Sequence, residues 1–392
     1  MSWEYKTLGE VGTVARGKSK HRPRNDESLY GGAYPFVQTG DVKHSGLYLT
    51  DYSQTYNEKG LAQSKLWPED TLCITIAANI ADTAILGMPA CFPDSILGFI
   101  PDEEKSDVRF VKYCFDLLQI NIQKMSQGST QDNLSLDKLD KIQFSFPQIA
   151  EQKKIAAVLS VLDDKIALNK KMNQKLEAMA KRLYDYWFVQ FDFPDENDRP
   201  YKTSGGPMTY NETLNREIPE GWIVVDINNL CDVVDCLHSK KPDYCFENED
   251  SYLLALENIT KEGYIDLSEK YYISNHDFKE WTSRICVKEN DFLFTNAERA
   301  GDMGMVPEGV SCAIGRNITA VRPKNVNPWY LRCFFKSLYM QEQILNNLDQ
   351  GSFFMSFNVR SIKKLQVLIP SKKMMDKFTA AIEPQLKQIE KK

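Results

Sequence analysis

The chain contains the same sequence framework twice, and this repeat limits its fold more than any single motif does. Residues 127–159 align with residues 350–382 at a constant shift of 223 positions. Both stretches begin with Gln-Gly-Ser, and their further identical pairs are Lys141/Lys364, Gln143/Gln366, Pro147/Pro370, Lys154/Lys377 and Ala157/Ala380. Internal self-similarity indicates repeated structural units, so we expect a duplicated domain that performs one kind of task at two places.

The repeat extends upstream, where short β-type runs alternate with turn residues in each copy. A helix is predicted after these runs, at residues 108–125 in the first copy and 328–345 in the second. This order of elements predicts an α+β (mixed α/β) fold with an internal pseudo-twofold repeat. The two similar globular domains are expected at residues 1–147 and 220–370.

A long amphipathic helix follows the first domain. Apolar residues and two asparagines recur in steps of four and three at Ile155, Leu159, Leu162, Ile166, Asn169, Asn173, Leu176, Ala180, Leu183 and Trp187. This a/d seam predicts a coiled-coil helix over residues 148–190, in which about 35 residues make a rod of roughly 50 Å at 1.5 Å per residue. The asparagines would form a polar layer that fixes the pairing register.

A second, shorter helix is predicted at residues 371–392, where the seam continues with Phe378, Ile382 and Ile389. The simplest arrangement is an antiparallel pair of long helices within the chain, lying between the two domains. Pro384 should kink the second helix because proline lacks a backbone N–H. Whether this short helix pairs within the chain or with another chain stays open. Residues 191–219, which hold four prolines and a Gly-Gly pair, are predicted to be a linker.

Composition restricts the class of protein. The hydrophobic content of 42% supports packed cores, and no apolar run is long enough to span a membrane. The nine cysteines are scattered without CxxC pairs, and the N-terminus has no apolar signal segment. Both features are typical of a reduced, cytoplasmic protein. With a net charge of −6, a nucleic-acid role would require local basic surfaces.

Two motifs suggest catalysis. Pro93-Asp94 followed by Glu103-Glu104-Lys105 resembles a nuclease motif, in which acidic groups hold Mg²⁺. Asn327-Pro328-Trp329-Tyr330 resembles the Asn-Pro-Pro-Tyr box of amino-methyltransferases. The other copy lacks each motif at the equivalent place, which favours a solvated loop for the first and a helix N-cap for the second. We therefore expect no catalytic residues in this chain.

A metal site is equally weakly indicated. Cys231, Cys236, His238 and Cys245 could be taken for a zinc set, but their spacing is unusual and the first copy has no cysteine there. The sequence therefore predicts no metal.

A basic segment is the best candidate for phosphate contacts. Five cations fall within nine residues, at Arg16, Lys18, Lys20, Arg22 and Arg24. The segment also contains glycine and proline, so we expect a mobile cationic loop that contacts DNA phosphates. The second copy has the weaker counterpart Lys240 and Lys241. The alternative is a solvated loop without function.

Polar loops at equivalent positions of the two copies are candidates for base contacts. Amide and hydroxyl side chains can hydrogen-bond base edges, and the candidates are Ser129, Thr130, Gln131 and Asn133 in the first copy and Ser352 and Phe353 in the second. Further DNA-contact candidates are Gln38, Asn79, Asn296, Arg299 and Asn358. The alternative is a turn that both copies share because the fold requires Gly128 and Gly351.

Several segments together resemble the specificity (S) subunit of Type I restriction–modification systems. The chain opens with Trp3-Glu4-Tyr5-Lys6-Thr7-Leu8-Gly9-Glu10-Val11, and its second half opens with Ile218-Pro219-Glu220-Gly221-Trp222. The long helix begins with Glu151-Gln152-Lys153-Lys154-Ile155-Ala156 and ends with Leu183-Tyr184-Asp185-Tyr186-Trp187-Phe188-Val189-Gln190-Phe191. The resemblance covers nearly the whole chain and includes the order of its parts.

The resemblance implies a non-catalytic, DNA-binding subunit of a bacterial or archaeal cytosol. Each target-recognition domain would read one half of a bipartite, asymmetric DNA target, and the helices would set the spacer. The helices would also dock two modification (methyltransferase) subunits, and restriction/translocase subunits would join them. S-adenosylmethionine, ATP and Mg²⁺ would belong to these partners, with no cofactor in this chain and no membrane involved. The alternative is a DNA-modifying enzyme, either a nuclease or an adenine methyltransferase, with a duplicated domain.

Overall fold

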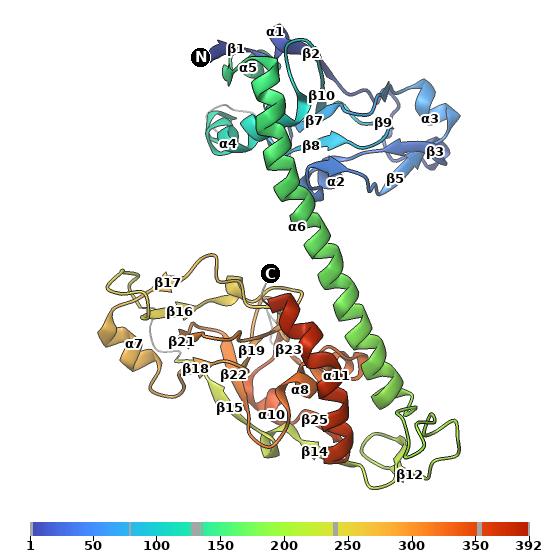
Figure 1. The fold of residues 1–392 in the computed structure, drawn as a ribbon, viewed down its shortest axis with the longest axis vertical. Helices are drawn as coiled ribbons and strands as arrows, with labels where there is room; N and C mark the ends of the chain where they lie inside the picture. Colours follow the sequence, from blue (N-terminus) through green and yellow to red (C-terminus); the bar gives the residue numbers. More distant parts are fainter. Residues whose placement is uncertain are drawn as a thin grey trace. The chain divides into compact units, whose positions relative to one another are not determined.

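The computed structural model describes residues 3–77, 80–126, 134, 136–237, 242–350 and 355–390. The chain forms two compact units, unit 1 (Met1–Lys170) and unit 2 (Lys171–Lys392), and each has its own hydrophobic cores (Figure 1). The boundary between the units lies inside the long helix.

Unit 1 is built on two β-sheets. The larger sheet has the strand order β2-β10-β7-β8-β4, and the smaller has the order β5-β3-β9-β6. A separate antiparallel pair joins the two ends of the domain, β1 (Glu4–Lys6) with β11 (Phe144–Phe146). The remaining strands are β2 (Gly12–Arg16), β3 (Tyr30–Phe36), β4 (Tyr48–Leu49), β5 (Gln54–Tyr56), β6 (Leu66–Trp67), β7 (Leu72–Thr75), β8 (Thr83–Leu86), β9 (Ala90–Cys91) and β10 (Ile96–Pro101).

Helices cover the larger sheet of unit 1. The predicted helix is observed as α4 (Val108–Ser126), which contacts β8. Its Phe115 is fully buried, with its ring centroid 4.9 Å from that of Phe144 on β11. The short helices are α1 (Leu8–Val11), the 3-10 turn η1 (Glu27–Leu29), α2 (Thr39–His44), α3 (Glu58–Ala62) and α5 (Leu136–Leu139).

Unit 2 has the same two-sheet plan. Its strand orders are β15-β22-β19-β20 and β17-β16-β21-β18, and β14 pairs separately with β25. The strands are β14 (Ile223–Asp226), β15 (Cys231–Asp235), β16 (Tyr252–Leu254), β17 (Tyr271–Tyr272), β18 (Val287–Lys288), β19 (Phe292–Thr295), β20 (Met303–Met305), β21 (Ser311–Ile314), β22 (Ile318–Pro323), β23 (Asp349–Gln350), β24 (Met355–Ser356) and β25 (Gln366–Ile369). Its helices are η3 (Ile227–Asn229), η4 (Leu256–Asn258), α7 (Asn275–Trp281), α8 (Pro328–Phe335), α9 (Leu338–Asn346), α10 (Val359–Lys363) and α11 (Lys372–Glu390).

Strand register shows that the two units are copies of one fold. In unit 1, Phe36 on β3 lies opposite Gln54 in an antiparallel pair and opposite Cys91 in a parallel pair. In unit 2, Leu253 on β16 lies opposite Tyr271 in an antiparallel pair and opposite Ala313 in a parallel pair. The duplicated domain and the mixed α and β fold expected from the sequence are therefore confirmed.

The long helix α6 runs without interruption from Ile149 to Tyr184 and continues into a π-helical turn, η2 (Asp185–Val189). Its start is fixed by Gln152, which is 1% exposed. The Gln152 side chain donates to the carbonyl oxygens of Pro147 (2.9 Å) and Lys105 (3.0 Å), and it accepts from the Asp107 amide (3.1 Å). Although α6 has 36 residues, neither it nor another described helix is long and apolar enough to cross a membrane.

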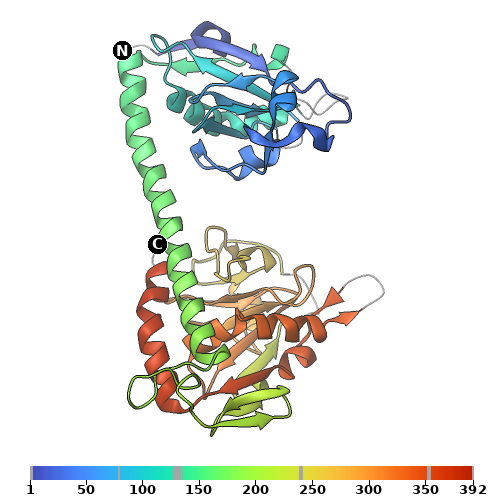
Figure 2. The same ribbon diagram turned by 90° about the vertical axis from the view of Figure 1, so that its right-hand side faces the viewer.

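In unit 2, the second half of α6 packs against α11. Figure 2 shows the two helices side by side. Tyr184 and Phe188 lie with their ring centroids 6.0 Å and 4.8 Å from that of Phe378, and Ile382, Leu386 and Ile389 extend the same core. Leu176, Leu183 and Ala180 of the predicted seam belong to this contact. The helix α11 passes through Pro384 and remains helical to Glu390.

The first half of the predicted seam is less buried than the sequence suggests. Leu162 and Ile166 are 54% and 52% exposed. Ile155 packs against the core of unit 1, whereas Leu159, Asn169 and Asn173 are half-buried. The reason is the difference in length, because α11 has 19 residues and α6 has 36.

The predicted linker is part of the fold of unit 2. It contains a hairpin of β12 (Met208–Asn211) and β13 (Arg216–Pro219). Phe193 is buried, and its ring stacks on Trp222 at 5.1 Å between centroids. Proline and glycine mark the turns here, but the aromatic residues between them supply enough apolar surface to join the core.

Candidate nucleic-acid interface

The basic segment of unit 1 follows β2 and is held through its backbone. The Gly17 amide donates to the Ile96 carbonyl (2.9 Å), and the Lys18 amide donates to the Phe92 carbonyl (3.0 Å). The Lys18 carbonyl accepts from the Ser64 hydroxyl (2.7 Å). A Cβ atom on residue 17 would lie 2.2 Å from the Pro93 carbonyl oxygen, so this close approach requires glycine.

Side chains fix the second half of the segment. Oε1 of Gln63 accepts from the backbone amides of Lys20 (2.6 Å) and His21 (3.0 Å). Nε2 of His21 lies 2.7 Å from Oδ2 of Asp26. Hydrogen bonds from Ser28 and His21 lower the pKa of Asp26 to about 2, so Asp26 is ionised at neutral pH. The segment is thus a fixed loop rather than the mobile edge expected from the sequence.

The five cations of the segment divide into two groups. Arg24 pairs with Asp94 at 2.5 Å, and Arg22 lies 4.0 Å from the same carboxylate while donating to the carbonyls of Ser19 and His21. Among the described residues, the side chains of Arg16, Lys18 and Lys20 form no ion pair. These three are the cations of unit 1's loop that remain available for an external anion.

The ion pairs that Asp94 forms with Arg22 and Arg24 argue against the nuclease interpretation. Asp94 faces two arginines, and Lys105 pairs with Asp102 at 2.8 Å in an exposed loop. Two of the three side chains that a nuclease would bring together, Asp94 and Lys105, are therefore engaged with other partners.

Three DNA-contact candidates of unit 2 have structural partners instead. The Arg299 guanidinium donates to the carbonyls of Leu256 and Ile259, both at 2.7 Å. Asn296 is buried and accepts from the Thr319 hydroxyl (2.9 Å). Asn358 caps α10, where its side chain accepts from the backbone amides of Arg360 and Ser361. Arg299 and Asn358 stabilise the domain by satisfying backbone groups, and Asn296 does so by satisfying a buried side-chain hydroxyl.

Outside the basic segment, the candidate DNA-contact residue Gln38 is exposed at the surface. It lies at the N-terminus of α2, and its exposed side-chain amide donates to Oε1 of Gln54 at 2.6 Å. The remaining candidates lie outside the described residues: Asn79, Ser129, Thr130, Gln131, Asn133, Lys240, Lys241, Ser352 and Phe353.

The methyltransferase-like box is a helix cap. Oδ1 of Asn327 accepts from the Trp329 amide (2.9 Å), with Pro328 in the first turn of α8. Trp329 and Tyr330 are buried in the core, and the Tyr330 hydroxyl donates to the Leu368 carbonyl. The box therefore cannot offer these side chains to a base.

The candidate zinc ligands do not form a metal site in the part of the chain that the structure describes. Cys231 and Cys236 are buried, Cys245 is exposed, and His238 is outside the described residues. Burial raises the pKa of the Cys231 thiol to about 12, so this thiol is protonated at neutral pH.

In each unit, an acidic residue of α6 forms a polar contact with a helix of the domain, α4 in unit 1 and the end of α8 in unit 2. In unit 1, Oδ2 of Asp163 accepts from the Tyr113 hydroxyl on α4 at 2.5 Å. In unit 2, Oε1 of Glu177 lies 2.9 Å from Nζ of Lys336, at the C-terminus of α8, and also accepts from the Tyr264 hydroxyl. Each domain is therefore attached to α6 by a directional polar contact as well as by apolar packing.

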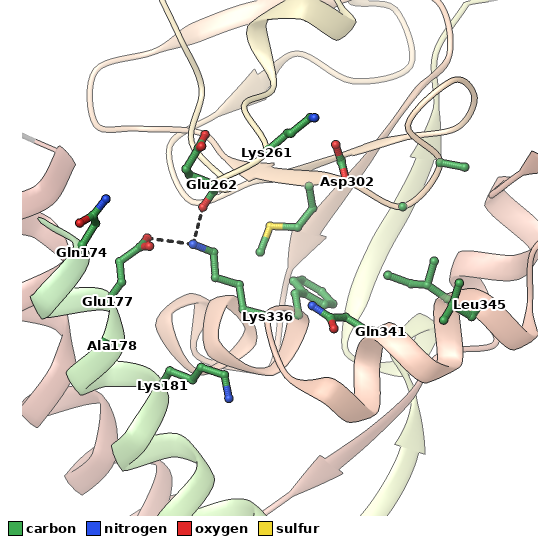
Figure 3. Close-up of a pocket in the computed structure, with 16 residues that line it drawn as sticks. Gln174, Glu177, Ala178, Lys181, Lys261, Glu262, Asp302, Lys336, Gln341 and Leu345 are labelled. Carbon is green, nitrogen blue, oxygen red and sulfur yellow. Dashed lines mark hydrogen bonds and ion pairs between the residues drawn. The ribbon is translucent and has the colours of Figure 1, made fainter. Parts of the chain in front are cut away.

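Glu177 lies at the side of a cavity of unit 2 with a volume of about 720 Å³ (Figure 3). In Figure 3 the Lys336 ammonium points between the Glu177 carboxylate and Glu262, whose backbone carbonyl accepts its second hydrogen bond. The guanidinium of Arg332, 1% exposed, lies 3.6 Å from Glu177 and 4.6 Å from the Tyr264 ring centroid. The cluster thus holds two cations against one carboxylate.

Burial and the neighbouring charges have opposing effects on the pKa values of Glu177 and Lys336. Burial alone would raise the pKa of Glu177, but Lys336, Tyr264 and Arg332 together lower it below its ordinary value. Burial and the neighbouring Arg332 lower the pKa of Lys336, although Glu177 opposes this. Removing the carboxylate would leave the buried Arg332 and the half-buried Lys336 together without a counter-charge, so the cluster depends on Glu177.

Sequence reasoning missed Gln152, Asp163 and Glu177 as structural contacts. A signal was present for Glu177, because Arg332 and Lys336 are one turn apart on an otherwise apolar helix and so require a nearby anion. No comparable signal existed for Gln152, because its partners are backbone groups of a distant loop.

The chain resembles proteins of one class. Residues 1–178 match the family model of the Type I restriction modification DNA specificity domain. The chain is 23% identical to the Type I restriction enzyme MjaIX specificity subunit of Methanocaldococcus jannaschii, over 99% of this chain and 87% of that one. It is 22% identical to the EcoBI specificity subunit of Escherichia coli, over 94% of this chain and 76% of that one.

A solved structure has the same fold. The S subunit of a Type I restriction–modification system from M. genitalium aligns with a TM-score of 0.59, over 100% of this chain and 92% of that one, at 14% identity. In its repeated domain, its long helix and the sequence of residues 1–178, this chain is similar to the specificity subunits of Type I restriction–modification systems.

Proposed function

We propose that unit 1 and unit 2 each read one half of a bipartite, asymmetric DNA target. The observation that carries the proposal is the repetition of one two-sheet topology with different side chains at equivalent places. Because the two units share one backbone framework, they would bind DNA in the same orientation. Because their surface side chains differ, they would recognise different sequences.

DNA binding by unit 1 would use the fixed basic loop. Arg16, Lys18 and Lys20 supply cations on a body whose net charge is −6. Phosphate contacts of this kind position a protein on DNA without reading its sequence. The isolated chain should therefore bind weakly and with strong salt dependence, and its partners should add phosphate contacts.

The helices would serve two further tasks. Because α6 is one continuous helix attached to unit 1 through Gln152 and to unit 2 through Glu177, it would set the spacer between the half-targets. The exposed apolar residues Leu162 and Ile166 suit contacts with two modification subunits. S-adenosylmethionine would be bound by those subunits, and ATP and Mg²⁺ by restriction subunits that join them.

Sequencing the methylated sites of cells that carry this chain with its modification subunits tests the proposal. A motif of two short, different halves separated by unread bases is expected. Replacing residues 1–147 by the equivalent domain of another specificity subunit should change one half only. A continuous motif, or a change in both halves, would contradict the two-domain model.

The alternative of a self-contained enzyme has a direct test. The purified chain is incubated with DNA, Mg²⁺ and S-adenosylmethionine, and then with the modification subunits added. Methyl transfer is expected only in the second mixture, because Asp94 and Lys105 are paired with other residues and Trp329 and Tyr330 are buried. Cleavage or methylation by the chain alone would overturn the assignment.

A further inference from the structure

Unit 1 contains a small surface cavity beside the basic loop. Its volume is about 230 Å³, and its lining includes Arg24, Tyr30, Phe36, Gln38, Gln54 and Tyr56. This is below the usual range for pockets that hold drug-sized ligands, which begins at roughly 300 Å³. The cavity suits a single flat ring system.

One side of the cavity is a fixed aromatic wall. Phe36 and Tyr56 are buried and stacked, with ring centroids 4.0 Å apart and planes 23° apart. Tyr30 lies against both, at 6.1 Å from Phe36 and 5.2 Å from Tyr56. Its hydroxyl donates to the Arg24 carbonyl at 2.7 Å, which ties the basic loop to this wall.

The rim of the cavity carries two glutamine amides. Nε2 of Gln38 donates to Oε1 of Gln54 at 2.6 Å, and this bond orients the Gln54 amide. Nε2 of Gln54 has no hydrogen-bond partner among the described residues, so it can donate to a third group. Side-chain amides in such positions pair with the edges of bases, and glutamine pairs most favourably with adenine.

The equivalent place in unit 2 has different chemistry. Strand register aligns Phe36 with Leu253 and Gln54 with Tyr271, and chain order then aligns Gln38 with Ala255 and Tyr56 with Ile273. In unit 2 these apolar side chains pack together with Trp281. The two copies thus share the backbone here but differ in polarity, which is the difference that two base-reading sites of unlike specificity require.

We infer that this cavity, bounded by the Tyr30–Phe36–Tyr56 wall and the Gln38–Gln54 amide pair, takes one nucleobase of the DNA target and reads its edge through Gln54. The inference rests on the proposed DNA-reading function of unit 1. The basic loop beside it would hold the adjacent phosphates, while Gln54 would determine the preference at one base position. The aromatic wall would exclude water from the bound edge, which strengthens the hydrogen bond.

The test uses Gln54→Glu in the complex of the full chain with its modification subunits. Glutamate keeps an oxygen that accepts from Gln38 but removes the amide donor, and its shape is nearly the same. Binding to randomised DNA is followed by sequencing of the selected molecules. The preferred base should change at one position of one half-target. The preference for that base over the others, about tenfold or more, should be lost or transferred to another base. The other half-target should be unchanged.

Gln143→Glu is the matched control, because Gln143 is an exposed glutamine of the same unit and adds the same charge. It should leave every base preference intact. Unchanged preferences in Gln54→Glu, or equal weakening of all sequences in both variants, would overturn the inference while leaving the two-domain function standing. If the unaltered complex itself selects no bipartite sequence, the proposed function fails, and this inference fails with it.

Discussion

Oε1 of Glu177 on α6 lies 2.9 Å from Nζ of Lys336, which follows the last residue of α8. The guanidinium of Arg332, one helical turn earlier, is buried 3.6 Å from the same carboxylate. A single acidic side chain of the long helix thus compensates two cations of unit 2. This arrangement attaches α6 to the domain, because the buried Arg332 and the half-buried Lys336 both need a nearby negative charge.

Glu177→Gln should destabilise unit 2. The amide is neutral, so the buried Arg332 and the half-buried Lys336 would remain without a compensating charge. We expect a loss of roughly 2 kcal/mol in the free energy of unfolding, below the value for fully buried pairs because Glu177 is 29% exposed. Chemical denaturation measures it. Asp164→Asn, at an exposed position of α6, should have little effect, and equal losses in the two variants would contradict the role of Glu177.

The same pair predicts a pH dependence. Because the pKa of Glu177 is lowered in the folded state from its ordinary 4.5, its contribution to stability is complete above that value. The contribution is lost as pH falls through the folded pKa. Between about pH 5 and pH 3, the unaltered protein should lose more stability than Glu177→Gln. Parallel stability curves for the two proteins over this range would show that the carboxylate charge is unimportant.

Lys20→Ala should weaken DNA binding without changing the sequence that is read. Lys20 is exposed, and its backbone amide bond to Gln63 does not depend on its side chain. The slope of the logarithm of affinity against the logarithm of salt concentration should become shallower by about 0.9. Fluorescence anisotropy at several salt concentrations measures the slope. Lys141→Ala, at another exposed lysine of unit 1, serves as control, and identical slopes in both variants would exclude a phosphate contact at Lys20.

Gln152→Leu should loosen the start of α6 from unit 1. The leucine fills the space but leaves the Asp107 amide and the carbonyls of Lys105 and Pro147 without their buried partner. A loss of roughly 2 to 4 kcal/mol is expected. Hydrogen exchange at the Asp107 amide should speed up in parallel. Gln148→Leu, four residues earlier and exposed, should leave both measurements unchanged.

The sequence repeat and the seam allowed the fold to be predicted because both are patterns in the order of residues. The constant shift between residues 127–159 and 350–382 indicates a duplicated domain, and steps of four and three indicate a long helix. Duplication of a structural unit produces the first pattern, and the periodicity of the helical backbone produces the second. They therefore survive into the structure as the paired two-sheet units and the uninterrupted α6.

The roles of individual polar residues could not be predicted in the same way. Arg299 was a candidate for DNA contact, but its guanidinium is used by carbonyls about forty positions away in the chain. The basic segment looked mobile because it contains glycine and proline, yet Gln63 and the carbonyl of Phe92 hold it in place. Such partners become visible only when the chain is folded.

The sequence by itself determined that this protein has a duplicated domain and a long helix, since local periodicity and self-similarity are properties of the chain order. Only the tertiary structure decided that Arg16, Lys18 and Lys20 are the cations of the basic segment that remain available, and which acidic residue of α6 binds Lys336. It also brought Gln38 beside Gln54 across neighbouring segments of one sheet. Hydrogen bonding and burial depend on distances between atoms that are remote in sequence, and those distances are set by packing of the whole domain.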